Sequence, residues 1–151
     1  MKRGVILNQV MSEMIANMGH GDKLIVCDAG FPIPRDAWRL DLAISKDFPD
    51  LTPVLRILMQ DFIAEKVIYG EEVRNYNPPL HKELQEIFSG IDIELVPHKK
   101  IIEEMPKQAK AFIRTGAFNP WGNIVLVSSP DVPKWFEREG TVVPEWYKAR
   151  V

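Results

Sequence analysis

Two side chains that can transfer a proton lie on either side of a short apolar run. His20 stands between two glycines in Met18–Asp22, and Asp28 directly follows Leu24–Cys27. Because an imidazole both gives and takes a proton near neutral pH, a histidine close to a carboxylate is a candidate general acid/base pair. The simpler interpretations are a histidine that caps helix carbonyls and an aspartate that bonds its own backbone in a turn. The sequence alone leaves both interpretations open.

Three other side chains are weaker candidates for chemistry. His98 follows a predicted strand, where either a binding histidine or a solvated loop histidine is expected. His81 falls in the first turns of a predicted helix, which favours a surface or packing role. Cys27 ends a strand, so a thiol nucleophile is a minor hypothesis beside that of a small buried side chain. Of the three, only His98 is retained as a candidate site residue.

The segment Phe118–Asn123 combines turn-forming residues with an indole and an amide. A plain turn is the simplest interpretation. An indole such as Trp121 beside an amide such as Asn123 is also typical of sugar sites. The ring packs on the apolar C–H face of a sugar while the amide bonds its hydroxyls. The segment is therefore a candidate monosaccharide site.

Alternating helices and strands are predicted to position these residues. Capping residues followed by apolar residues at the helical period predict three helices, which run from Asn8 to Gly19, from Thr52–Pro53 onward, and from Asn77 to Gly90. A fourth helix over residues 99–110 is predicted to break at Pro106. Apolar or alternating runs predict strands over residues 24–27, 39–45, 66–69, 91–96, 111–114 and 123–127. This order predicts an α/β fold, a three-layer α/β/α sandwich with a mainly parallel sheet of about six strands and ligands at the strands' carboxyl ends.

Composition narrows the classes of protein that fit. The chain has 151 residues, 46% of them hydrophobic, so a single domain with a sizeable core is expected. Nineteen Lys and Arg against 21 Asp and Glu give a net charge of −2, which argues against nucleic acid as a partner. No apolar run approaches the roughly 20 residues that span a bilayer, and no secretory signal is evident, so a cytoplasmic protein with no membrane partner is expected. The single cysteine excludes an intramolecular disulfide, and no Cys/His spacing indicates a metal site.

A change in composition divides the chain in two. Residues 1–129 contain all of the predicted strands and form the α/β domain. Residues 130–151 contain two of the four Trp and three of the 12 Pro. We expect this C-terminal extension to pack on the domain or on a neighbouring subunit.

Seven parts of the chain, spread over residues 2–128, resemble the D-ribose pyranase family in their order and spacing. This family is the ribose branch of the ribose pyranase and fucose mutarotase superfamily. The parts are Lys2–Gly4 with Leu7–Asn8, Met18–Asp22, Cys27–Pro34, Asn77–His81, His98, Ile113–Gly116 and Asn119–Ile124.

The resemblance implies an activity and a set of site residues. The activity is that of a cytoplasmic isomerase that interconverts the pyranose and furanose forms of D-ribose without a cofactor or metal. It also implies a ring-like homodecamer whose sites lie where neighbouring subunits meet. By motif position, His20 is the implied proton donor, and the implied substrate-binding residues are Asp28, His98, Trp121, Gly122 and Asn123.

The chain departs from the family pattern in two places. Trp121 stands where the family usually has tyrosine, which removes a hydroxyl and enlarges the stacking face. Residues 130–151 extend beyond the usual end of the ribose branch. Trp121 motivates one alternative, a mutarotase that acts on L-fucose or another monosaccharide. A second alternative, a non-catalytic sugar-binding accessory protein of ribose uptake, would use the same pocket residues without turnover. His98 and Ala29–Pro34 resemble the ribose branch rather than the fucose branch.

Overall fold

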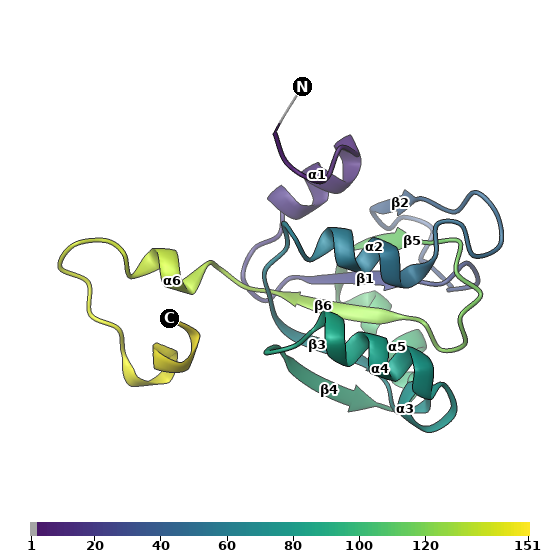
Figure 1. Ribbon diagram of the computed structural model, residues 1–151. Coiled ribbons are helices and arrows are strands. Elements are labelled where there is room, and N and C mark those ends of the chain that lie inside the picture. Colours follow the sequence, from purple (N-terminus) through teal and green to yellow (C-terminus); the bar gives the residue numbers. More distant parts are fainter. Residues whose placement is uncertain (1–2) are drawn as a thin grey trace.

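A six-stranded sheet forms the centre of the computed structural model, which describes residues 3–151 (Figure 1). Lys2, the first residue of the family-like motifs, lies outside the described residues. In the order β2-β5-β1-β6-β3-β4, the strands are Arg39–Asp41, Ala109–Arg114, Lys23–Cys27, Ile124–Ser128, Ala64–Gly70 and Asp92–Val96. The predicted α/β fold is therefore confirmed.

The direction of β6 decides which residues meet at one edge of the sheet. The β2–β5, β5–β1 and β3–β4 pairs are parallel, whereas β6 runs antiparallel to both of its neighbours, β1 and β3. The residues that precede β6 therefore lie at the same edge as the carboxyl ends of the parallel strands. This arrangement puts the segment before Ile124 beside the segment after Cys27.

Helices cover the two faces of the sheet unequally (Figure 1). One face packs against α1 (Gln9–Ala16), α2 (Leu51–Leu58) and α4 (Pro78–Ile87), and the other against α5 (His98–Glu103). Successive side chains of β1 point to opposite faces of the sheet, as in any pleated strand. Leu24 and Val26 lie in the larger hydrophobic core, and Ile25 and Cys27 lie in the smaller one. The smaller layer leaves part of the sheet face near α5 open.

Two of the three predicted helix caps are confirmed. The Asn8 side chain caps α1 by accepting from Met11 N at 2.9 Å, and Asn77 caps α4. The prediction that Thr52 caps a helix was wrong: Asp50 accepts from Leu51 N at 2.7 Å, which starts α2 one residue before Thr52. Thr52 is buried inside the first turn instead.

Other predicted boundaries shifted for local reasons. The first helix ends at Ala16, where the Asn17 side-chain amide donates to Glu13 O at 2.9 Å, and Gly19 lies beyond this end. The predicted strand over residues 39–45 stops at Asp41, whose carboxylate accepts from Ala43 N at 3.0 Å and turns the chain. The helix predicted to break at Pro106 does so, because α5 ends at Glu103 and a 3₁₀ turn, Met105–Lys107, follows. A short helix, α3 (Glu71–Tyr76), was not predicted.

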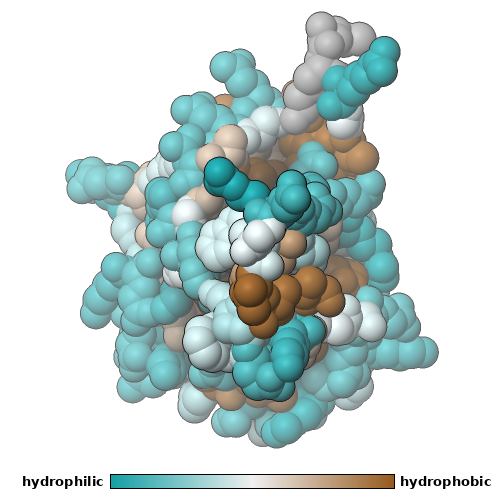
Figure 2. Space-filling view, turned by 90° about the vertical axis from the view of Figure 1, so that its left-hand side faces the viewer, coloured by the Kyte–Doolittle hydropathy of each residue, from teal (hydrophilic) through white to brown (hydrophobic). Residues whose placement is uncertain are grey.

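After β6 the chain leaves the sheet as a separate arm (Figure 1). This C-terminal arm, residues 130–151, contains α6 (Val132–Trp135) and the 3₁₀ helix η2 (Glu145–Arg150), which pack together through Phe136 and Tyr147 with ring centroids 6.0 Å apart. Figure 2 views this end of the molecule and shows a small hydrophobic group ringed by hydrophilic residues. Among residues 3–151, no helix is both long enough and apolar enough to cross a bilayer.

Candidate functional site

Asp28 and Asn123 form a reciprocal pair at the edge where β1 ends and β6 begins. Asp28 N donates to Asn123 Oδ1 at 3.0 Å, and Asn123 Nδ2 donates to Asp28 Oδ2 at 2.9 Å. The other carboxylate oxygen, Oδ1, accepts from Gly30 N at 2.8 Å. The turn interpretation of Asp28 is thus confirmed through Oδ1, while Oδ2 orients the buried amide of Asn123. The pair presents oriented polar atoms at the sheet edge.

A cleft of about 370 Å³ opens beside this pair, which is within the size range of small-molecule sites. Arg114, at the end of β5, forms part of its wall and is itself fixed. Its Nε and Nη2 donate to Ala29 O at 3.0 and 2.9 Å, and its Nη1 donates to the Asp41 carboxylate at 3.0 Å. The cleft is lined by Asp28, Ala29, Gly30, Arg114, Ala117, Phe118, Asn119 and Pro120.

The loop that carries Trp121 is held in an unusual conformation. Trp121 has a φ of 59°, a left-handed value that costs a non-glycine residue energy and so needs support from its surroundings. Gly122 must be glycine, because a Cβ there would lie 2.8 Å from Asn119 O. Asn77 Nδ2 donates to Asn119 Oδ1 at 2.6 Å and to Pro120 O at 3.0 Å, so the residue that caps α4 also anchors the loop.

The indole of Trp121 lies against a second aromatic ring. The ring centroids of Tyr76 and Trp121 are 5.5 Å apart, tilted by 37°. Tyr76 is otherwise exposed, so the two rings form an aromatic surface next to Asn123. Such a surface suits the apolar face of a sugar.

His98 begins α5 and is fixed through its backbone. Its N–H donates to Glu72 Oε2 at 2.8 Å, and its Nδ1 is buried without a hydrogen-bond partner among the described residues. Burial lowers the pKa of His98, against the opposing charges of Glu72 and Asp28, which favours a neutral imidazole at pH 7. Gly70 makes room for the ring, because a Cβ there would lie 3.0 Å from Nδ1.

His20 lies at the opposite edge of the sheet from these residues. Its Nε2 donates to Glu65 Oε2 at 2.9 Å, near the start of β3, and the neighbouring Gly21 N bonds Ser128 O at the far end of β6. The length of β1, about 13 Å at roughly 3.3 Å per residue, separates His20 from Asp28. Within one chain, therefore, the structure brings together Asp28, Trp121, Gly122 and Asn123, sets His98 at the same edge, and leaves His20 apart.

Of the two remaining titratable candidates, Cys27 lies in the core and His81 is partly buried. Burial raises the pKa of the Cys27 thiol, which donates to Ile113 O at 3.6 Å, so a thiolate nucleophile is disfavoured. His81 Nδ1 and the Tyr69 hydroxyl lie 3.0 Å apart, which gives His81 the packing role expected from the sequence. Within residues 3–151, no three His, Cys, Asp or Glu side chains gather as metal ligands.

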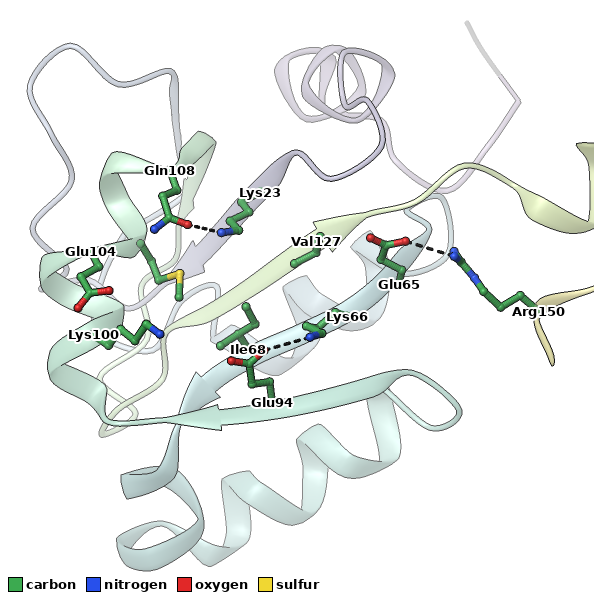
Figure 3. A pocket seen from close by; sticks show the side chains of 11 residues that line it. Lys23, Glu65, Lys66, Ile68, Glu94, Lys100, Glu104, Gln108, Val127 and Arg150 are labelled. Atoms are coloured by element: carbon green, nitrogen blue, oxygen red, sulfur yellow. Dashed lines mark hydrogen bonds and ion pairs between the residues drawn. The ribbon is translucent and has the colours of Figure 1, made fainter. Parts of the chain in front are cut away.

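A larger cleft, of about 570 Å³, lies on the open sheet face beside α5 and reaches Glu65 (Figure 3). Four of its charged side chains form two ion pairs: Lys66 Nζ lies 3.1 Å from Glu94 Oε2, and Arg150 Nη1 lies 3.3 Å from Glu65 Oε2. Mutual neutralisation leaves no strong field of one sign in this cleft.

Sequence reasoning missed several residues that support the site. Glu65, Glu72 and Arg114 all act through contacts with residues distant in sequence, and Glu65 lies in an ordinary strand pattern that gives no signal. A signal did exist for Glu72, which follows β3 at the ligand-binding edge of the sheet. The Asn77 capping motif was recognised, but its bonds to the Trp121 loop were not predicted.

The chain is similar to known proteins in both sequence and structure. A model of the RbsD / FucU transport protein family matches residues 1–130. The chain is 55% identical over 150 residues to "D-ribose pyranase 2" of Rubrobacter xylanophilus, covering 99% of this chain and 97% of that protein. It is 48% identical over 151 residues to "D-ribose pyranase 1" of Streptomyces griseus, covering both chains fully. The structure of Bacillus subtilis RbsD complexed with D-ribose superimposes with a TM-score of 0.82 at 34% identity, covering 86% of this chain and 98% of that one.

Proposed function

The chain belongs to the RbsD / FucU transport protein family, and from this membership we propose that it is a D-ribose pyranase, an isomerase that interconverts the pyranose and furanose forms of D-ribose. The observation that carries the proposal is the 55% identity to a protein of that name over nearly the whole chain. The cleft beside Asp28 and Asn123 agrees with it, because its size and polarity suit a monosaccharide.

We assign sugar binding to the residues of the strand-end edge. Asp28 and Asn123 present fixed acceptors and donors to the hydroxyls, and Trp121 presents its ring to the apolar C–H face. Gly122 lets the loop approach closely. His98, neutral at pH 7, gives one further donor or acceptor. The site needs neither a metal nor a cofactor in this proposal.

We assign proton donation to His20 of a neighbouring copy. The sheet holds His20 and Asp28 of one chain at opposite edges, so a complete site requires two chains. We therefore propose a homo-oligomer, and specifically a decamer, in which His20 of each copy faces the cleft of the next. The open sheet face beside α5, which adjoins Glu65, is available for such a contact.

The chemistry then follows from proton transfer. Protonation of the ring oxygen as the anomeric hydroxyl loses its proton breaks the bond from C1 to the C5 oxygen and gives the open aldehyde. Attack on C1 by the C4 oxygen, with the proton transfers reversed, closes the furanose. Because ring opening already occurs in water, a general acid/base contribution of about 10²- to 10⁴-fold together with positioning suffices.

The test is NMR exchange spectroscopy on D-ribose at equilibrium. Catalytic amounts of the protein should speed magnetisation transfer between pyranose and furanose signals, and His20→Ala should abolish the acceleration with the oligomer intact. His81→Ala is the matched control, because that histidine packs against Tyr69 and is not assigned to the site. Acceleration retained by His20→Ala would overturn the assigned role of His20.

One observation favours a second candidate function. Trp121 gives a larger stacking face than the tyrosine usual in the family, and its contact with Tyr76 enlarges that face further. A mutarotase for L-fucose or another monosaccharide would show faster exchange for that sugar than for D-ribose in the same experiment. Binding without any acceleration would instead indicate a sugar-binding accessory protein. A cytoplasmic location is proposed with the enzyme, and fractionation of cells tests it.

A further inference from the structure

One carboxylate oxygen links His20 to the C-terminal arm. Glu65 Oε2 accepts from His20 Nε2 at 2.9 Å and lies 3.3 Å from Arg150 Nη1. Figure 3 shows Glu65 and Arg150 pointing toward each other from β3 and from the arm. The three side chains are partly exposed, at 47% for His20, 25% for Glu65 and 33% for Arg150, so water competes for each contact.

The fold of the arm brings Arg150 to this position. Its guanidinium also bonds Ser129 Oγ, just after the end of β6, and its Cζ lies 5.5 Å from the centroid of the Tyr147 ring. Tyr147 in turn packs on Phe136, which joins η2 to α6. Contacts with Ser129, Tyr147 and Glu65 hold the guanidinium of Arg150, which in turn restricts the Glu65 carboxylate.

We propose that Arg150 is a positioning residue for His20 and acts through Glu65; the inference rests on the proposed function. A half-exposed imidazole held by a single carboxylate can rotate with that carboxylate. Anchoring Glu65 from a second side restricts both side chains. With Nε2 bonded to Glu65, His20 keeps Nδ1 free to exchange a proton with the sugar. The arm thereby becomes part of the catalytic machinery.

The arm lies outside the part of the chain that defines the family. The family model matches residues 1–130, so the shared fold alone does not supply Arg150. Chains that end with the common domain must orient this histidine by other means. The proposal therefore concerns a feature added to the common domain.

The charged side chains that follow His20 in the sequence have partners other than Glu65. Asp22, on its own loop, pairs with Lys110 Nζ at 2.6 Å, and Lys23 bonds Gln108. Removal of Arg150 therefore chiefly changes the charge balance at Glu65. Without the guanidinium, Glu65 keeps its contact with His20 but loses its second anchor, so both side chains gain freedom to rotate.

The experiment compares Arg150→Gln with Arg138→Gln in the NMR exchange assay. Arg138 lies on the same arm, is exposed, and its side chain makes no hydrogen bond or ion pair within residues 3–151, so it controls for the change in net charge. We expect Arg150→Gln to lower kcat by about tenfold with little change in KM, below the roughly 10²-fold that a 1 Å misplacement can cost. Arg150→Lys should recover part of the loss, because a lysine keeps the charge but not the planar fork.

A double variant separates positioning from a general structural effect. If Arg150 acts through Glu65, then Arg150→Gln should have no further effect on kcat in a Glu65→Gln background. Equal activity of Arg150→Gln and Arg138→Gln, or additive losses in the double variant, would overturn the inference. A native chain that leaves ribose exchange at its background rate would refute the proposed function instead.

Discussion

Replacing Asn123 by aspartate tests whether the Asp28–Asn123 pair is the electrostatic centre of the cleft. The change is nearly isosteric, and the acceptor for Asp28 N–H is kept. It replaces the Nδ2 donor, 2.9 Å from Asp28 Oδ2, by a second carboxylate oxygen. Asn123 is only 2% exposed, so water screens the new charge poorly. The variant chain must either hold two facing carboxylates or take up a proton.

The cost of proton uptake limits the size of the effect. An unfolded aspartate has a pKa of about 3.9, and each pH unit above it adds about 1.4 kcal/mol to the cost of keeping one carboxyl protonated. The folded variant adopts the less costly of two states, one protonated carboxyl or two repelling carboxylates. At pH 7 the free energy of unfolding should therefore fall by up to about 4 kcal/mol. At pH 4 a shared proton restores a hydrogen bond between the two groups, so the loss should shrink to below about 1 kcal/mol.

The sign of the pH dependence is opposite to that of an ordinary paired carboxylate. The folded variant holds its proton more tightly than the unfolded chain, so the variant matches the native protein below pH 4 and loses stability as pH rises above it. Denaturant unfolding at a series of pH values and one fixed protein concentration measures the difference. Asn123→Ala, which lacks the added charge, is the control. A loss that is the same at pH 4 and pH 7 would refute the reasoning.

Two further predictions concern the groups around the cleft. Asn77→Ala removes the cap of α4 and both bonds to the Trp121 loop. We expect it to lower the free energy of unfolding by about 1–2 kcal/mol and to raise KM for ribose. An unchanged KM in the exchange assay would contradict the anchoring role. Burial lowers the pKa of both His98 and His81, so the unfolded chain binds more protons than the folded chain near pH 6. The free energy of unfolding should therefore be highest above about pH 6.5 and should decline as pH falls below that value. Thermal unfolding at pH 7.5 and 5.5 measures this decline, and a His81→Gln, His98→Gln variant that shows the same decline would show that other groups cause it.

Local residue chemistry was enough to predict most elements of the fold. Asn8 and Asn77 each start a helix where the sequence predicts one, because the cap bonds only backbone groups within three residues. The start of α2 was misplaced because Asp50 and Thr52 are both good caps, and burial of Thr52 against the core decided between them.

The candidate site was predictable only in part. That Asp28 and Asn123 would meet depends on β6 running antiparallel to β1, and no pattern within either segment encodes the direction of a strand. Glu65 and Arg150 could not be recognised for the same reason, since each gains its contact from a residue far away in the chain.

The sequence by itself therefore determined the residue types, the helix caps and the alternation of strands and helices, because these depend on interactions between near neighbours. The tertiary structure decided which side chains share an edge of the sheet. It brought Asp28, Trp121 and Asn123 together and held His20 a strand's length away, beside Glu65 and the C-terminal arm. Strand order and direction follow from the packing of the whole core, which balances contacts across all six strands of the sheet in residues 3–151.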